Sequence, residues 1–136
     1  MLPSSALAGP PVRQSHCQRV IYILQLRMFE VRQTAEFSRW LAALLDPVGR
    51  AAVLTRLARL GLGNPGDVKP VGAGVWELRI DVGPGYRAYY MRVGEKVYLM
   101  LGGGDKSSQA KDVDRAIRMA SELKSAARAK KARKSK

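Results

Sequence analysis

The fold is decided by residues 75–90, which read VWELRIDVGPGYRAYY. From residue 76 to residue 81, apolar side chains alternate with charged ones, and this period of two is typical of a half-buried β-strand. Residues 82–85 (VGPG) combine the residue types that favour a tight turn. An extended pattern returns over residues 86–91, so the whole stretch predicts an antiparallel β-hairpin.

The segments after this hairpin predict one more strand and a final helix. Gly94 and Glu95 mark a second turn, and residues 97–101 then form an almost continuous apolar run. Such a run suits an inner strand that is buried on both faces. The glycines at 102–104 are expected to end this strand. The final helix then starts near Ser107 or Ser108, with four apolar residues facing inward: Val113, Ile117, Ala120 and Leu123.

Before the hairpin, apolar residues recur with the spacing typical of helices that bury one face. Thr34 is the expected N-cap of a first helix, and Asp46 with Pro47 is expected to start a second helix after a tight corner. Gly61 or Gly63 ends the second helix. The inward faces of the two helices comprise Phe37, Trp40, Leu41, Leu44, Val53, Leu57 and Leu60.

Together these elements predict an α+β domain. A strand of about five residues begins at Phe29, where the side chains alternate. Residues 62–74 are rich in glycine and proline and are interpreted as a loop. The resulting order is β-α-α-β-β-β-α, with an antiparallel sheet packed against two N-terminal helices. Trp40 and Trp76 both fall on inward-facing positions and are expected in the core.

The length of 136 residues suits one domain, expected at residues 28–123. Residues 1–27 begin with a stretch rich in proline, alanine, serine and glycine and are interpreted as a disordered extension upstream of a natural start at Met28. The alternative is a genuine N-terminal arm. The longest apolar run, residues 20–26, falls far short of a membrane span of roughly 20 residues. A cytoplasmic protein without a membrane partner is therefore expected.

The net charge of +13 is concentrated at the two ends of the chain. Residues 124–136 carry seven Lys/Arg and residues 1–27 carry three, with no acidic residue in either, which leaves +3 for residues 28–123. The basic tail is a candidate RNA-binding arm that extends the last helix. The alternative is a disordered tail that binds nothing specific. The candidate contacts are Lys130, Lys131, Arg133 and Lys134.

The metal-ligating residue types are too few for a zinc site. The chain has one cysteine and one histidine, Cys17 and His16, which are adjacent. Structural zinc usually takes four ligands at regular spacing. No metal and no other cofactor is therefore predicted.

Three separated motifs resemble the phage-type addiction-module killer proteins, HigB-like members of the RelE/ParE toxin superfamily. They are VWELRID at residues 75–81, GPGYRAYY at 83–90 and LGGGDKSSQ at 101–109. The MFEV stretch at 28–31 and the order of elements agree with that family, and the resemblance covers residues 28–123. It implies a small RelE-like fold and a toxin that a cognate helix-turn-helix antitoxin holds inactive.

The resemblance also implies roles for four residues. In RelE-like toxins, basic side chains on the exposed face of the sheet cleave mRNA on the ribosome. Arg87 matches a catalytic arginine, Arg79 stands where a relative has a strand lysine, and Lys106 falls near another catalytic arginine. Glu77 departs from the pattern, because it replaces a second strand lysine. Residues 109–115 also lack the catalytic tyrosine of some relatives.

RNA cleavage through the 2′-hydroxyl requires a base, positive charge beside the phosphate and an acid for the leaving oxygen. Arginine stays protonated, so Arg79 and Arg87 suit phosphate binding and not proton transfer. Glu77 is the candidate base and Lys106 the candidate acid. The alternatives are a cross-strand salt bridge between Glu77 and Arg87, or a contact with the antitoxin. Tyr89 is either a base-stacking residue or a half-buried sheet tyrosine.

The leading prediction is thus the toxin of a type II toxin–antitoxin pair, an endoribonuclease whose partners are the antitoxin, mRNA and the ribosome. One alternative is a ParE-like toxin that poisons gyrase without being an enzyme. The other is a nucleic-acid-binding protein that acts through its basic tail. RNA cleavage requires Arg79, Arg87 and Lys106 to act together, whereas gyrase poisoning requires no such cluster.

Overall fold

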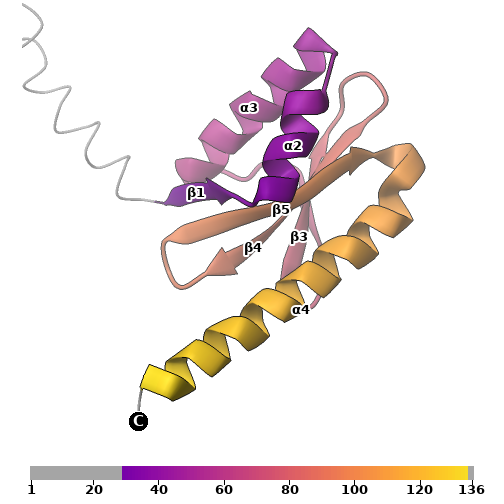
Figure 1. The fold of residues 1–136 in the computed structure, drawn as a ribbon. Helices are drawn as coiled ribbons and strands as arrows, with labels where there is room; N and C mark the ends of the chain where they lie inside the picture. The colour runs from indigo at the N-terminus through magenta and orange to yellow at the C-terminus, as the bar shows by residue number, and fades with distance from the viewer. Residues whose placement is uncertain (1–28, 135–136) are drawn as a thin grey trace, which may run out of the picture.

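Within residues 29–134, five strands form one sheet, with helices on both of its faces (Figure 1). A computed structural model describes residues 29–134. The expectations about an extension at residues 1–27, a natural start at Met28, and Cys17 and His16 concern residues outside this range. The elements are β1 (Glu30–Gln33), α2 (Ala35–Ala43), α3 (Pro47–Gly61), β2 (Val68–Gly72), β3 (Val75–Ile80), β4 (Tyr86–Val93), β5 (Val97–Asp105), a 3₁₀ turn (Lys106–Ser108) and α4 (Gln109–Lys134).

The α+β class is confirmed, and the two predicted helix starts are confirmed with it. Thr34 accepts a hydrogen bond from the backbone N–H of Phe37 at 3.2 Å, and Asp46 accepts one from Val48 at 3.1 Å. Pro47 occupies the first position of α3, where its missing N–H costs nothing. Within residues 29–134, no helix is long and apolar enough to span a bilayer.

The sheet is mixed, whereas an antiparallel sheet was predicted. Its order is β1-β5-β4-β3-β2, and β1 runs parallel to β5 with Val31 opposite Tyr98. Parallel neighbours need a long connection between them, and here two helices and three strands separate β1 from β5. Thr34 fixes the junction, because its backbone N–H donates to the carbonyl of Met100 and its hydroxyl donates to the carbonyl of Leu101, both at 3.0 Å.

The prediction of a loop over residues 62–74 is wrong in its second half, where β2 forms the edge of the sheet. Lys69 lies opposite Glu77 and Pro70 opposite Trp76. Proline lacks the N–H that an inner strand needs, and it is tolerated here because β2 has a neighbour on one side only. The pairing becomes irregular between Pro70 and Gly72, so the strand has no clear period of two.

The glycines at 102–104 lie within β5 and do not end it, contrary to the prediction. A Cβ atom on Gly103 would overlap the ring of Trp40 in α2, and one on Gly104 would overlap the carboxylate of Asp112 in α4. Glycine in a strand often marks such a close approach. These residues therefore allow α2 and α4 to pack closely on opposite faces of the same strand.

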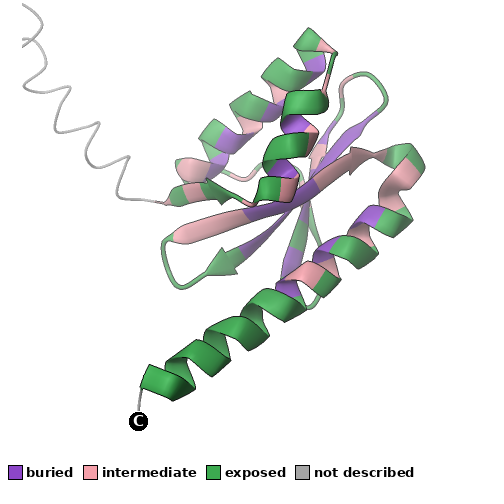
Figure 2. Cartoon of the chain, viewed as in Figure 1, coloured by how far each residue is buried: buried purple, intermediate pink, exposed green. Residues whose placement is uncertain are grey.

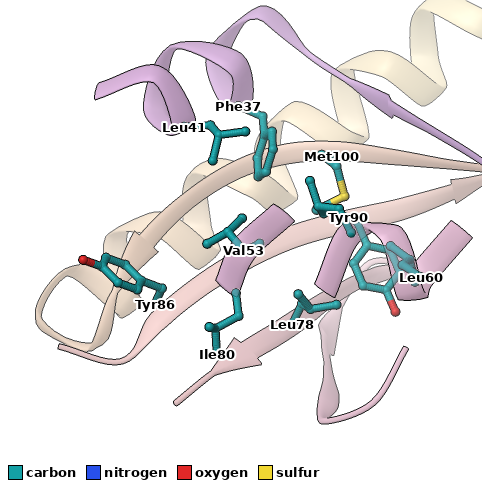
Figure 3. Close-up of a cluster of buried hydrophobic side chains, with 11 residues drawn as sticks. Phe37, Leu41, Val53, Leu60, Leu78, Ile80, Tyr86, Tyr90 and Met100 are labelled. Carbon is teal, nitrogen blue, oxygen red and sulfur yellow. The ribbon is translucent and has the colours of Figure 1, made fainter. Parts of the chain in front are cut away.

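Two apolar layers hold the domain together, one on each face of the sheet. Under α2 and α3, the first layer joins Phe37 and Leu60 to Leu78 and Met100 (Figure 3). Under α4, the second layer is formed by Val75, Tyr89, Met91, Leu101, Ala116 and Ala120, with Val113 and Ile117 partly buried against it. The prediction had two helices covering the sheet. In the structure, a third helix, α4, covers its other face.

Two residues predicted to face inward are exposed. Leu123 keeps 37% of its surface accessible, and all of residues 121–134 are exposed (Figure 2). Trp76 is also 37% exposed. The helices α2 and α3 pack over Leu78 and Ile80, further along β3, and leave Trp76 at the margin of the first layer.

Candidate functional site

Glu77 lies at the centre of a cluster of polar side chains between the sheet and α4. Its carboxylate is completely buried. Its Oε1 atom lies 3.3 Å from Nε of Arg79 and 4.0 Å from Nε of Arg87. Its Oε2 atom accepts hydrogen bonds from the Tyr89 hydroxyl at 3.2 Å and from the Gln109 amide at 2.6 Å. We call these five residues the central cluster.

The central cluster follows from the register of the β3–β4 hairpin. Arg79 lies directly opposite Arg87, and Glu77 lies directly opposite Tyr89. Side chains two residues apart in a strand share a face, so all four point to the α4 side of the sheet. The strands thus bring together Glu77, Arg79 and Arg87, and the proposed salt-bridge partners Glu77 and Arg87 are 4.0 Å apart.

Arg87 is the least exposed cation of the central cluster. Only 6% of its surface is accessible, because α4 covers the sheet face that the resemblance led us to expect open. One of its terminal nitrogens donates to the carbonyl of Tyr86 at 3.1 Å. Its Nε is buried and has no hydrogen-bond partner within residues 29–134. An unpaired buried donor is costly and uncommon in folded proteins.

Arg79 forms the accessible side of the central cluster. Its side chain is 34% exposed and has a second carboxylate, that of Asp67, at 4.0 Å. The loop before β2 is fixed beside it, because the guanidinium of Arg56 donates to the carbonyls of Arg79, Pro65 and Asp67. Arg79 is therefore the cation of this cluster that a solvent-borne anion reaches first.

Tyr89 belongs to the core and offers no free ring face to an RNA base in this arrangement. It is completely buried in the second apolar layer. Burial raises the pKa of its hydroxyl well above the usual value, and the negative charge of Glu77 raises it further. Tyr89 therefore stays protonated and donates to Glu77, so the base-stacking interpretation does not fit its position.

Lys106 stands apart from the central cluster, in the exposed turn after β5. Its side chain lies across Gly85, where an added Cβ atom would come within 3.0 Å of Lys106 Cε. Its backbone N–H donates to the Gly85 carbonyl at 3.1 Å. Asp105 caps this turn, and hydrogen bonds from the hydroxyl and the N–H of Ser107 hold the pKa of that carboxyl below its usual value.

The basic tail continues α4 as a helix as far as Lys134. Residues 124–134, which we call the basic arm, are all exposed and include no acidic residue. Of the two predicted forms of the tail, the structure has the helical one over this range. Its cations are Lys124, Arg128, Lys130, Lys131, Arg133 and Lys134.

Gln109 and Asp112 were missed by sequence reasoning. Both lie in the first turn of α4, where a polar residue usually faces solvent. Gln109 instead reaches Glu77, and Asp112 is 9% exposed, with the hydroxyl of Ser108 donating to it and Arg115 at 3.9 Å. The signal available was the motif at residues 101–109, which ends on Gln109.

The chemistry that the central cluster offers is anion binding by two fixed guanidinium groups. Guanidinium groups match phosphate oxygens in geometry and keep their charge at all physiological pH values. Within residues 29–134, no three His, Cys, Asp or Glu side chains come together as metal ligands.

Comparison with known proteins places the central cluster inside a shared region. A family model described as phage-derived protein Gp49-like (DUF891) matches residues 39–125. An uncharacterized protein of Haemophilus influenzae is 42% identical over 94 residues, which cover 69% of this chain and 95% of that relative. No solved structure gives a significant match. The region matched by the family model contains all five residues of the central cluster.

Proposed function

Because the chain belongs to the phage-derived Gp49-like family, a toxin-like family compatible with a toxin–antitoxin role, we propose that it is the toxin of a type II pair and cuts mRNA. In this proposal, a helix-turn-helix antitoxin holds the toxin inactive, and the ribosome presents the mRNA in the cytoplasm. The observation that carries the proposal is the buried guanidinium of Arg87, whose Nε has no hydrogen-bond partner within the described residues.

The pairing of two arginines supports an anionic ligand. Arg79 and Arg87 lie directly opposite each other, and like charges in such positions destabilise a sheet. Glu77 offsets part of this cost, but one carboxylate faces two guanidinium groups. A phosphate of the RNA backbone would supply the missing negative charge and an acceptor for Arg87 Nε. Preplaced donors of this kind stabilise the charge that develops on phosphate during cleavage.

Access to Arg87 requires the first turn of α4 to move. Arg87 is 6% exposed, whereas the side chain of Arg79 is 34% exposed. That turn is joined to the central cluster by the hydrogen bond from Gln109 to Glu77, which in this proposal is the contact that closes the site. We therefore propose that RNA binds first at Arg79 and reaches Arg87 when Gln109 withdraws.

The same movement would free the candidate base. Both hydrogen bonds to Oε2 of Glu77, from Tyr89 and Gln109, occupy the atom that would take a proton. With Gln109 withdrawn, Glu77 takes the proton of the 2′-hydroxyl, which attacks the phosphate. Lys106 lies outside the central cluster, in the exposed turn after β5, so the proposal requires its side chain to swing towards the bound phosphate and donate a proton to the leaving 5′-oxygen.

The basic arm would strengthen binding without adding chemistry. Lys130, Lys131, Arg133 and Lys134 are exposed on one continuous helix, so they can approach RNA phosphates beyond the cleavage site. Each phosphate contact releases counterions, which makes this part of the affinity salt-dependent and insensitive to sequence.

The test is induced expression in bacteria, with growth measured and mRNA 5′ ends mapped in the same cells. The full chain should arrest growth and create new 5′ ends. Arg79→Ala, at a partly exposed position, should lower cleavage about 10²–10³-fold. Arg87→Ala should lower cleavage to the same extent. Arg87→Lys keeps the positive charge but loses the geometry of the guanidinium, so it separates these two contributions. Arg50→Ala, an exposed arginine of α3, is the matched control.

Two outcomes would overturn the proposal. Growth arrest by the full chain without new mRNA ends would exclude cleavage and favour the gyrase-poisoning alternative. New ends that persist unchanged in both Arg79→Ala and Arg87→Ala would show that the central cluster does not carry the reaction. Thermal unfolding of each variant verifies that it is folded.

A further inference from the structure

A pocket of about 220 Å³ lies on the face of the sheet opposite to the central cluster. It is lined by Pro65, Val68, Trp76, Tyr90, Arg92 and Tyr98. Trp76 and Tyr90 are paired across β3 and β4, and Arg92 and Tyr98 are paired across β4 and β5. These strands alternate their side chains between the two faces, so the pocket residues point away from Glu77 and Arg87.

Three of the six residues that line this pocket are aromatic. The rings of Tyr90 and Tyr98 meet edge to face with centroids 5.4 Å apart, and Phe29 lies against Tyr98 at 4.8 Å. Each tyrosine is therefore held in place by another ring. Within residues 29–134, no aromatic ring pairs with Trp76 in this way, and Trp76 is 37% exposed although it is the largest apolar side chain of the group. The pocket thus combines a rigid aromatic wall with one accessible indole.

The charge of the pocket is positive. The guanidinium carbon of Arg92 lies 5.4 Å from the ring centroid of Phe29 and 5.9 Å from that of Tyr98. One nitrogen of Arg92 donates to the carbonyl of Glu95 at 2.7 Å, and the residue is exposed. The lining residues include no carboxylate. Burial also raises the pKa of Tyr90 to about 12, so its hydroxyl remains a neutral donor at physiological pH.

We propose that this aromatic pocket binds an unpaired nucleobase of single-stranded RNA, with the base against Trp76 and Tyr98 and a neighbouring phosphate on Arg92. The inference rests on the proposed action on RNA and adds a second RNA contact on the other face of the sheet. Stacking on aromatic side chains suits any base, because every base has a flat π-face, and arginine beside the rings supplies the charge for the backbone.

The competing occupant is an apolar segment of a protein partner, and the lining favours RNA over it. A helical partner lays the apolar face of an amphipathic helix into an elongated hydrophobic groove. Such a groove lies elsewhere on the protein, lined by Met91, Val93, Leu99, Leu123 and Ala127, with Arg92 and Lys124 beside them. The aromatic pocket differs from this groove in its three aromatic rings, Trp76, Tyr90 and Tyr98, and flat rings beside Arg92 match a base and its phosphate.

The test uses Trp76 itself as the probe. The chain has two tryptophans, so Trp40→Phe leaves Trp76 as the only one. A 2′-O-methyl octauridylate is the ligand, because it lacks the 2′-hydroxyl that cleavage requires. Its binding should quench the fluorescence of Trp76, and an abasic oligomer of equal length should not. Trp76→Phe, which leaves only Trp40, is the matched control and should show no quenching.

Affinity measurements give the size of the effect. Trp76→Ala and Tyr98→Ala should each weaken binding of the octauridylate roughly 5- to 150-fold, the range expected for the loss of one stacked base. Arg92→Gln, at an exposed position, should weaken binding and reduce its salt dependence while the fold stays intact.

The outcomes separate this inference from the proposed function. Binding of the octauridylate without quenching of Trp76, or equal binding of the abasic oligomer, overturns the base pocket and leaves mRNA cleavage standing. Quenching in a protein that creates no mRNA ends in cells overturns cleavage and keeps the pocket. If the antitoxin alters Trp76 fluorescence and RNA does not, the pocket serves the protein partner and the inference is wrong.

Discussion

The side-chain amide of Gln109 donates a 2.6 Å hydrogen bond to Oε2 of Glu77, 32 residues earlier in the chain. This contact joins the first turn of α4 to a carboxylate that is completely buried between β3 and its neighbours. It therefore ties the first turn of α4 to the central cluster of the sheet.

Replacing Gln109 by alanine should lower the free energy of unfolding by about 1–3 kcal/mol, because it removes a hydrogen bond to a buried charge. Urea unfolding measures this change. Gln33→Ala is the control, since the side chain of Gln33 accepts an exposed hydrogen bond from the hydroxyl of Ser38 and its loss should matter by less than about 0.5 kcal/mol. Amide hydrogen exchange in the first turns of α4 should also accelerate in Gln109→Ala. Equal unfolding free energies for the two variants would contradict a stabilising role of the Gln109–Glu77 bond.

Gly103→Ala should destabilise the domain by about 1–3 kcal/mol through overpacking, since the new methyl group would overlap the Trp40 ring. Thermal and urea unfolding give the change. Gly61→Ala is the control, because a Cβ there lies 3.5 Å from Val31 in ordinary contact. In a double-mutant cycle with Trp40→Leu, the two changes should couple. Simple additivity would mean that Trp40 is not the obstacle.

The stability of the wild type should fall more steeply with acid than that of Asp46→Asn, because only the wild type has a carboxylate there to protonate. The backbone N–H of Gly49 and the hydroxyl of Tyr86, which donates at 2.9 Å, hold the pKa of Asp46 below its usual value. A lowered pKa in the folded state gives stability that is present above the usual value near 3.8 and is lost as the pH falls through the lowered value. Urea unfolding between about pH 6 and about pH 2 should therefore show a shallower decline in Asp46→Asn. Tyr86→Phe removes one of the hydrogen bonds to Asp46, so its decline in stability should lie between those of the wild type and Asp46→Asn.

Neutralising four cations of the basic arm should change the salt dependence of RNA binding. With Lys130, Lys131, Arg133 and Lys134 replaced by glutamine, the slope of log affinity against log salt should become shallower by about 0.7 for each RNA phosphate that the arm no longer neutralises. Fluorescence anisotropy with a labelled single-stranded RNA measures the slope. A control protein carries the same number of glutamine replacements at exposed cations elsewhere, namely Arg39, Arg50, Arg59 and Lys69. An equal effect of both sets would mean that net charge alone attracts RNA.

The parts of the fold that sequence alone predicted are those with local causes. The hairpin of β3 and β4 follows from a period of two around a turn of glycine and proline, and the starts of α2 and α3 follow from Thr34, Asp46 and Pro47. In each case, the residues that determine the element lie within it or next to it.

The parts that were missed depend on contacts between distant residues. An alternating strand shows that Glu77 and Arg87 share a face, but the alternation does not show that α4 will cover that face. The same holds for Gly103, which looks like a strand end until Trp40 is placed against it. The edge strand β2 was missed because Pro70 and Gly72 give it no regular pattern.

The parallel pairing of β1 with β5 ties the beginning of the domain to a strand made near the end of its synthesis. Glu30 pairs with Val97 and Gln33 with Met100, so β1 has no strand partner until those later residues have left the ribosome. A nascent chain that ends before β5 lacks this pairing, and one that ends before Gln109 lacks the donor that closes over Glu77. The order of synthesis thus sets the order in which this domain can be completed. The central cluster takes its final form only after Gln109 has been made.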